Sequence, residues 1–370
     1  MARRRGDWWL ALGVFVLGGC ASAPRGDSIE MEAMHFAVID GPGGRRVEAL
    51  DPETLFIEGN RAFEAQDFAQ AADKYAMIVD RFPGSRWERV ATFNAGLALE
   101  KDKRFADAVP RFEALVRDVA GSKDAQDALF RIAACEEAMQ DWSGMHASVE
   151  EILRPHFPGL GVGDRIAALA LRGRAWEGRG ELALAERDYR AALELYQKNL
   201  ELRGLDKSPQ VSLAQFRIGE IYKDLFASIR FKLPLERMAR DLEDKSNFFL
   251  MAQSAYLRAL RLQHADWAVV AGFQLGALYE QMYIDMLAAE VPSDLTEEEL
   301  GIYNEELKKK VRPLLVRAID IFERNLRLGQ RFGKRDDWMA KTEASLARLN
   351  DMLRAESRAS GEPGKAPVTP

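Results

Sequence analysis

The sequence has few of the residues that carry enzyme chemistry. Its 370 residues include only two cysteines and four histidines, and the histidines (His35, His146, His156 and His264) never occur at the paired spacing of zinc ligands. Neither a zinc-protease motif of the form H-E-x-x-H nor a nucleophile elbow of the form G-x-S-x-G is present. We therefore predict no metal site, no cofactor and no catalytic residues.

An excess of positive charge is also missing. The chain has 52 Lys and Arg against 58 Asp and Glu, which gives a formal net charge of −6. Nucleic-acid binding rests on clustered Lys and Arg, so the acidic balance disfavours nucleic acid as a partner. The same balance disfavours broad adhesion to anionic lipid, because polybasic segments supply that attraction.

The N-terminus has the features of a secretory signal. Three arginines at positions 3–5 precede an apolar run of ten residues at positions 8–17. A positively charged start, a short apolar segment and small residues at the cleavage point are typical of signal peptides. A membrane-spanning helix needs about 20 apolar residues, so we do not expect this run to be a permanent span.

The run ends in Leu17-Gly18-Gly19-Cys20, which resembles the lipobox of bacterial lipoproteins. The resemblance implies that residues 1–19 are removed and that Cys20 becomes the acylated first residue, palmitate included, of a chain anchored in the lipid bilayer. By the same resemblance, the alanine after the cysteine, Ala21, implies that the protein is located at the outer membrane, and we expect it to face the periplasm. Only Cys135 then remains, so an internal disulfide is excluded. Cys135 is followed by two glutamates, which predicts a buried and inert thiol, because reactive thiols need cationic surroundings.

Downstream of residue 51, small and aromatic residues recur at helical spacing. Gly59 and Gly96 lie 37 residues apart, and each is followed by an alanine twelve residues later and an aromatic residue sixteen later. The pattern resembles the tetratricopeptide repeat (TPR), a pair of antiparallel helices. The matching positions are Gly59, Ala71, Tyr75 and Pro83 in the first unit, Gly96, Ala108 and Phe112 in the second, and Gly173, Ala185, Tyr189 and Ala192 in the fourth. The third unit departs, with Met145 in place of the alanine.

The resemblance gives each residue type a packing role. The small residues let the two helices of one unit approach closely, the aromatic residue fills the space between successive units, and proline ends the second helix. Two further units carry the same residues with insertions of about 21 and about 30 residues between their helices. Their positions are Gly219, Tyr222, Ala252, Tyr256 and Ala259 in the fifth unit, and Gly276, Tyr279, Ala318 and Phe322 in the sixth.

The insertions, at about 228–246 and 289–311, are not plain loops. The first alternates apolar residues from Ile229 and then becomes a charged helical segment from Glu236. The second opens with a capping box at Thr296, which predicts a short helix to about Lys309 with three lysines at its C-terminal end. Two interpretations stay open: the insertions are a binding face, or they extend helices that pack on their own repeat.

The fold expected is all-α: a TPR-like solenoid of about six helix pairs with a C-terminal capping helix. The segments are a signal peptide (1–19), a lipidated flexible tether (20–50), regular TPR units 1–4 (51–200), elaborated units 5–6 (201–335), a capping helix (336–358) and a disordered tail (359–370). The two tryptophans Trp87 and Trp267 each lie nine residues before a unit glycine, and this shared phase predicts packing at the start of the first helix of a unit.

TPR solenoids bind extended segments of other proteins along a concave surface, so we expect a non-enzymatic scaffold whose partners are other envelope proteins. The chain resembles the TPR lipoprotein of the myxobacterial gliding-motility apparatus, through its inserted units and its last helix. Over residues 50–160 it also resembles the TPR lipoprotein of the β-barrel assembly machine. A cell-wall-modifying enzyme is a remote alternative, because repeats, tether and cap occupy the length that a catalytic domain would need.

Overall fold

The structure is a computed structural model that describes residues 35–359, apart from 42–43, 155–158, 203, 206–207 and 263. The predicted signal peptide, the lipobox at Leu17 to Cys20, the tether before residue 35 and the tail after residue 359 lie outside the described residues. Expectations for those segments remain predictions.

The described part opens with a β-hairpin. Strand β1 (His35–Gly41) pairs antiparallel with β2 (Gly44–Leu50), in a register that runs from His35 opposite Leu50 to Gly41 opposite Gly44. The prediction of a flexible tether is therefore wrong for residues 35–50. Valine and isoleucine favour extended backbone, and glycine and proline between two such segments of sequence are a hairpin signal.

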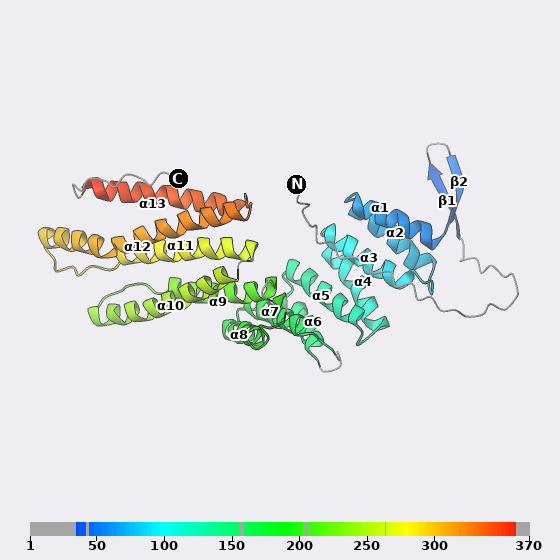
Figure 1. The fold of residues 1–370 in the computed structure, drawn as a ribbon, viewed down its shortest axis with the longest axis horizontal. Helices are drawn as coiled ribbons and strands as arrows, with labels where there is room; N and C mark the ends of the chain where they lie inside the picture. The colour runs from blue at the N-terminus through cyan, green and yellow to red at the C-terminus, as the bar shows by residue number, and fades with distance from the viewer. Residues whose placement is uncertain are drawn as a thin grey trace.

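Thirteen α-helices follow in the described residues, as six antiparallel pairs and a final helix (Figure 1). In each pair the odd-numbered helix comes first. The pairs are α1 (Pro52–Glu64) with α2 (Phe68–Arg81), α3 (Glu88–Lys101) with α4 (Phe105–Asp118), α5 (Lys123–Ala138) with α6 (Trp142–Leu153), α7 (Val162–Gly178) with α8 (Leu182–Gln197), α9 (Pro209–Ser228) with α10 (Leu235–Arg261), and α11 (Ala265–Leu287) with α12 (Glu297–Arg331). The last helix is α13 (Asp337–Ala359).

Five of the six pairs are held together by an aromatic ring that lies against a glycine, whereas the third pair has the buried residues Ala133 and Val149 in these places. A Cβ atom built on Gly59 would lie 2.7 Å from the ring of Tyr75, and one on Gly219 would lie 2.6 Å from the ring of Tyr256. The same contact joins Gly96 to Phe112, Gly173 to Tyr189 and Gly276 to Phe322. The aromatic residue therefore packs within its own unit, which corrects the expectation that it fills the space between successive units. Glycine is needed because any Cβ would push the ring, and with it the second helix, away.

The other repeat positions are buried between the two helices of a pair. The repeat alanines of the second helix in each pair have no exposed surface. Their small side chains let the backbones of the two helices approach closely. These fully buried positions are Ala71, Ala108, Ala185, Ala192, Ala252, Ala259 and Ala318, and Met145 takes the same place in the third pair. Pro83 follows the end of α2, whose C-cap is Phe82.

The insertions lengthen the helices of the last two pairs. Residues 229–234 form a short connection, after which α10 runs 27 residues from Leu235. The capping box at Thr296 and Glu299 is present and starts α12, but α12 continues for 35 residues to Arg331. The predicted end near Lys309 is wrong, and the lysines at 308–310 lie inside a helix. Pro313 does not stop α12, because packing of its C-terminal half on α11 outweighs the loss of one backbone hydrogen bond.

The pairs stack into an open arc, with α1 near one end and α13 at the other (Figure 1). From α5 onward each odd-numbered helix contacts the next odd-numbered helix, whereas no contact of similar extent joins consecutive even-numbered helices in the described part of the chain. The odd-numbered helices therefore form the inner layer of the arc. Figure 1 shows α2, α4, α6 and α8 on its outer side. The helix α13 packs on α12 and α11 and covers the last pair.

Candidate functional site

A metal centre and a reactive thiol are two kinds of site that the described residues could form. No cluster of histidine, cysteine or carboxylate side chains that could bind a metal ion occurs among them. Cys135 is fully buried, and this burial raises the pKa of its thiol to about 12, so the thiol stays protonated and inert. Within residues 35–359 no described helix is both long enough and apolar enough to traverse a bilayer. The candidate binding surfaces are therefore the inner and outer faces of the arc.

Aromatic residues line the inner layer at a fixed place in the repeat. A phenylalanine lies three residues before the repeat glycine or alanine in five of the six pairs: Phe56, Phe93, Phe130, Phe216 and Phe273. Three of these rings contact a tryptophan of the next unit, with centroid distances of 4.6 Å for Phe56 and Trp87, 5.2 Å for Phe216 and Trp267, and 5.3 Å for Phe273 and Trp338. Trp87 and Trp267 thus pack at the start of the first helix of a unit, as their phase in the sequence predicts, and the structure adds that all three tryptophans join successive units.

A row of polar contacts, here called the inner ladder, joins successive odd-numbered helices. Each rung pairs a carboxylate near the C-terminal end of one helix with an arginine of the next. The rungs are Glu100 with Arg131 (3.3 Å), Glu137 with Arg174 (3.0 Å), Glu177 with Arg217 (2.9 Å) and Glu280 with Arg348 (2.6 Å). Between α9 and α11 the partner is an amide instead, because Gln274 donates to Glu220 at 3.3 Å.

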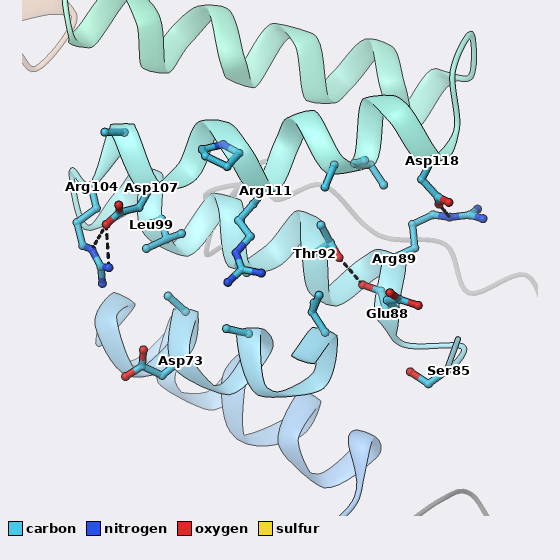
Figure 2. Close-up of a pocket in the computed structure, with 18 of the residues that line it drawn as sticks. Asp73, Ser85, Glu88, Arg89, Thr92, Leu99, Arg104, Asp107, Arg111 and Asp118 are labelled. Atoms are coloured by element: carbon cyan, nitrogen blue, oxygen red, sulfur yellow. Dashed lines mark hydrogen bonds and ion pairs between the residues drawn. The ribbon is translucent and has the colours of Figure 1, made fainter. Parts of the chain in front are cut away.

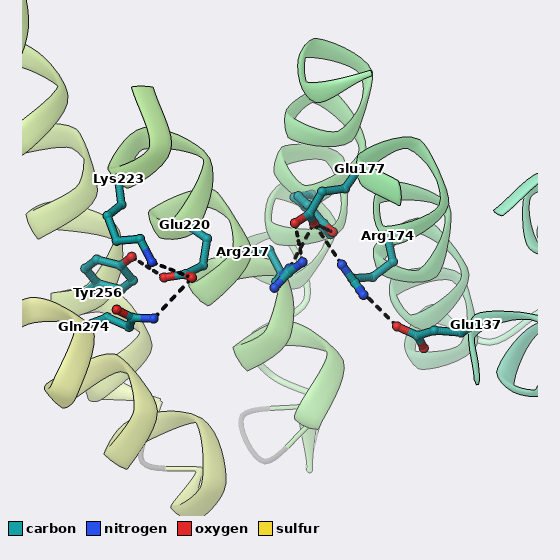
Figure 3. Close-up of polar contacts among 9 residues, drawn as sticks. Glu137, Arg174, Glu177, Arg217, Glu220, Lys223, Tyr256 and Gln274 are labelled. Carbon is teal, nitrogen blue, oxygen red and sulfur yellow. Dashed lines mark hydrogen bonds and ion pairs between the residues drawn. The ribbon is translucent and has the colours of Figure 1, made fainter. Parts of the chain in front are cut away.

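The centre of the ladder is a connected network (Figure 3). Arg174 lies between Glu137 and Glu177, and Glu177 also accepts hydrogen bonds from Arg217 and from the hydroxyl of Tyr189. Burial by itself would lower the pKa of the Arg174 guanidinium. The attraction of the neighbouring carboxylates is larger in sum, so the pKa is raised. The network is only partly solvent-exposed, with 18% of the Arg174 side chain accessible, so these charges are fixed in position.

The repeat tyrosines add hydroxyls to this network. Tyr256 donates to Glu220, which also accepts from Lys223 at 2.9 Å, as Figure 3 shows. Burial raises the pKa of Tyr256 far above its usual range, and nearby Glu220 raises it further, so the hydroxyl remains a donor. Tyr222 donates to Glu186 and accepts from Arg190 at 3.0 Å, which joins α9 to α8. Tyr279 accepts a hydrogen bond from Gln253.

The inner ladder was missed in the sequence, although a signal was there. Glu100, Glu137, Glu177 and Glu280 each lie four residues after the small residue of their unit. Arg131, Arg217 and Gln274 each lie two residues before it, and all three can donate a hydrogen bond, whereas Arg174 and Glu220 directly follow the glycine of their unit. The two positions are recognisable only once the repeat register is applied to polar residues as well as to the small and aromatic ones.

The first insertion is organised around one buried cation. The side chain of Lys245 is completely inaccessible, and its ammonium donates to the carbonyls of Phe226 (2.7 Å) and Ile229 (2.9 Å) and pairs with Asp285 (2.7 Å). It also lies 4.0 Å from the ring centroid of Phe226. The three N–H donors of the ammonium are therefore all used, at the point where α9, α10 and α11 meet. Of the two interpretations, this part of the insertion supports the one in which the extended helices pack on their own repeat.

Grooves on the outer face lie between consecutive even-numbered helices. One hollow, of about 850 Å³, lies over α3 between α2 and α4, as Figure 2 shows. Two more hollows, of about 680 and 240 Å³, occupy the corresponding places over α9 and over α11. A groove of this kind is a consequence of the arc, because the outer helices are spread apart where the inner helices touch.

No protein-family model and no curated protein matches the chain. Solved structures similar to it include a TPR protein from Parabacteroides merdae, 13% identical over 80% of this chain and 98% of that one, with a TM-score of 0.40. A TPR protein from Bacteroides fragilis is 15% identical over 82% of this chain and 99% of that one, with a TM-score of 0.29. These low scores carry no inference about function. The TPR-like solenoid rests on the repeating helix pairs and on the contact between glycine and aromatic ring in five of the six pairs.

Proposed function

We propose that the protein is a non-enzymatic scaffold that binds an extended segment of a partner protein along the inner face. The observation that carries this proposal is the continuity of the face: the inner ladder runs from α3 to α13 without a break between units. Its acidic and basic groups are held by packing at regular intervals. Fixed donors and acceptors of this kind favour recognition of an extended chain, because little side-chain entropy is lost on binding.

The proposed location is the outer membrane, facing the periplasm, with the lipid on Cys20 as the anchor. The support is the sequence Leu17 to Cys20 and its likeness to a lipobox. The acidic chain offers little other attraction to an anionic bilayer, so lipid on Cys20 would provide the attachment. The tether places the solenoid near other proteins of the envelope.

Replacing the lipidated cysteine tests this location. Cys20→Ala should abolish incorporation of a radiolabelled fatty acid and move the protein from the membrane pellet to the soluble periplasmic fraction. Retention of the variant in the outer membrane would refute anchoring through Cys20. The matched control is Cys135→Ala, which removes the other cysteine and should leave both labelling and fractionation unchanged, because Cys135 is buried.

For the complex, we propose an envelope assembly such as the gliding-motility machinery, with accessory function in β-barrel assembly as the alternative. A photo-reactive amino acid at Ile57 would distinguish them. Ile57 lies two residues before Gly59, in the register of the ladder donors, and is 50% exposed. Crosslinking in cells followed by mass spectrometry should recover motility proteins in one case and β-barrel assembly proteins in the other.

The control for this experiment is the same photo-reactive residue at Asp73, on the outer face between α2 and α4. The inner-face proposal expects a partner at Ile57 and none at Asp73. Equal crosslinking from the two positions would contradict it. Release of soluble glycan from purified cell walls by the purified chain would instead revive the enzyme alternative.

A further inference from the structure

The outer helix of the fifth pair, α10, exposes large apolar side chains. Four of its leucines are between 39% and 61% exposed: Leu235, Leu242, Leu250 and Leu257. The outer helices of the regular pairs differ, because α2, α4, α6 and α8 expose no large apolar side chain among the described residues. In Figure 1, α10 forms the lower edge of the C-terminal part of the arc, with no other helix below it. The exposed leucines are therefore particular to α10 and are not a property of the repeat.

The four leucines belong to one side of the helix. Seven positions follow one another in steps of three or four residues, here called the leucine stripe: 235, 239, 242, 246, 250, 253 and 257. At about 100° per residue these positions lie within an arc of about 80°, and at 1.5 Å per residue the stripe is about 33 Å long. Met251 is also exposed, but it lies about 100° beyond the edge of this arc. Such a stripe is the pattern that packs one helix against another.

The leucine stripe is symmetric about its central position, Ser246. Leu242 and Leu250 lie four residues to either side of the centre, and the other two leucines lie eleven residues to either side. When two identical helices pack antiparallel about a twofold axis, each residue before the centre faces the residue at the same distance after it. Every leucine of the stripe would then face a leucine, and the small serine would face itself at the axis.

The charges of α10 also favour an antiparallel partner of the same sequence. The half before Ser246 has four acidic residues and two arginines besides Lys245, whose charge is paired with buried Asp285. The half after Ser246 has Arg258 and Arg261 and no acidic residue. Antiparallel packing places the acidic half of each copy against the basic half of the other, whereas parallel packing brings like charges together.

We propose that the leucine stripe is the interface of a homodimer, in which α10 packs antiparallel on α10 of a second copy of this chain. Leu242 contacts Leu250 of the second copy. Glu236 lies about 3 Å along the helix axis from Arg258 of the second copy, within reach of an ion pair. Neither Glu236 nor Arg258 has an ion pair within the described part of its own chain. The interface uses the outer face, so the inner ladder remains free for another protein.

Sedimentation equilibrium of the full-length chain in neutral detergent measures the association. The chain should pass from monomer to dimer at concentrations on the order of 1–100 µM, because a small interface of two helices gives a reversible dimer. Leu242→Ser with Leu250→Ser should raise the dissociation constant at least tenfold, since both leucines lose their apolar contacts. The matched control is Met251→Ser, which changes an exposed apolar side chain of α10 outside the stripe and should leave the constant unchanged.

Charge reversal tests the predicted ion pair. Glu236→Lys places like charges together at both ends of the interface and should raise the dissociation constant about fivefold. Adding Arg258→Glu to the same chain reverses both partners and should restore the original constant. A double variant as weak as Glu236→Lys alone would overturn the antiparallel register.

Disulfide crosslinking tests the register by distance. Ser246→Cys should give a disulfide-linked dimer under mild oxidation, because position 246 meets itself at the twofold axis. Leu235→Cys should give none by itself, since its two copies would be about 33 Å apart, but it should crosslink when mixed with Leu257→Cys. The unsubstituted chain is the control and should not crosslink, because Cys135 is buried and lipid is expected on Cys20.

Four results would overturn the proposal. The chain could remain monomeric over the whole concentration range, or its dissociation constant could be unchanged by the two serine substitutions. Efficient crosslinking of Leu235→Cys with itself would show parallel packing. A Cys20→Ala chain that is monomeric but binds phosphatidylglycerol vesicles through the leucine stripe would assign the stripe to a lipid surface. Circular dichroism melts confirm that each variant is folded.

Discussion

Replacement of Lys245 by methionine is expected to be one of the most damaging single substitutions in the C-terminal half. Methionine has a similar length and no charge, so it fills the space but leaves two backbone carbonyls and Asp285 without their donor. Asp285 is only 8% exposed. Removing one partner of a buried ion pair typically costs about 3–5 kcal/mol, because the other charge stays buried and uncompensated. Asp285 keeps Arg230 at 3.1 Å and Gln281 at 2.8 Å, which places the expected loss near the lower figure.

Urea unfolding followed by circular dichroism measures this loss, and hydrogen exchange locates it. Lys245→Met should lower the unfolding free energy by about 3 kcal/mol and should speed exchange where α9, α10 and α11 meet. The matched control is Lys198→Met, which removes the same group from a surface pair with Glu194 and should cost at most about 1 kcal/mol. A loss at Lys245 no larger than that at Lys198 would refute the reasoning.

A double variant sharpens the test. Lys245→Met with Asp285→Leu leaves no buried charge, and Arg230 remains hydrated because 62% of its side chain is exposed. Replacing a buried pair by apolar residues is often nearly neutral, so the double variant should be more stable than Lys245→Met alone. A double variant that loses the sum of the two single losses would show that the pair does not act as a unit.

Further predictions concern the repeat contacts and pH. Gly219→Ala should destabilise the chain by about 1–3 kcal/mol in urea unfolding, because the new Cβ would lie 2.6 Å from the ring of Tyr256, whereas Gly301→Ala, with nothing within 4 Å in an exposed helix, should stabilise it by about 0.5–1 kcal/mol. Equal effects of the two alanines would contradict the packing role of the glycine. Burial, with Asp141 and Glu113 adding to it, raises the pKa of Glu136 to about 7 in the folded state from 4.5. Between pH 4.5 and pH 7 the Glu136 carboxyl is protonated in the folded chain but ionised in the unfolded chain. The stability of the folded chain is therefore highest, as far as Glu136 affects it, below pH 4.5, and it decreases as the pH rises through 7. The loss is at most about 3 kcal/mol at 1.36 kcal/mol per pKa unit. Urea melts at pH 5 and pH 8.5 should therefore show Glu136→Gln gaining stability over the unsubstituted chain at the higher pH, and a gain independent of pH would show that the carboxyl is not protonated in the fold.

The residues that pack in the regular units could be predicted because they lie close together in the sequence, although each aromatic ring lies within its own unit and not, as expected, between units. A glycine and an aromatic residue sixteen positions later meet across one tight turn, so their spacing alone brings them into contact. The phase of Trp87 and Trp267 likewise predicted packing at the start of the first helix of a unit, where their rings contact Phe56 and Phe216 of the preceding unit. In the two elaborated pairs the same contact forms across a longer connection, and only the identity of the residues, not their spacing, pointed to it.

The candidate surfaces could not be predicted in the same way. In the sequence Lys245 follows Glu243 and Asp244 and has the pattern of a solvated charge, and only the packing of α11 against α9 and α10 buries it. The continuity of α12 through Pro313 also depends on tertiary contact, since local preference alone would end a helix there. The hairpin of residues 35–50 could not be predicted from composition, because glycine and proline occur both in flexible linkers and in tight turns.

The sequence by itself determined the repeat, the identity of the buried glycine, alanine and aromatic residues, and the likeness of its N-terminus to a lipobox. These are local patterns, and the 3.6-residue period of the helix translates them directly into faces and contacts. Only the tertiary structure decided which charges meet in the inner ladder, because its rungs combine residues of different units. Their partnership depends on how far each unit turns relative to the last, which is set by the packing of whole helices and by no short segment of the chain.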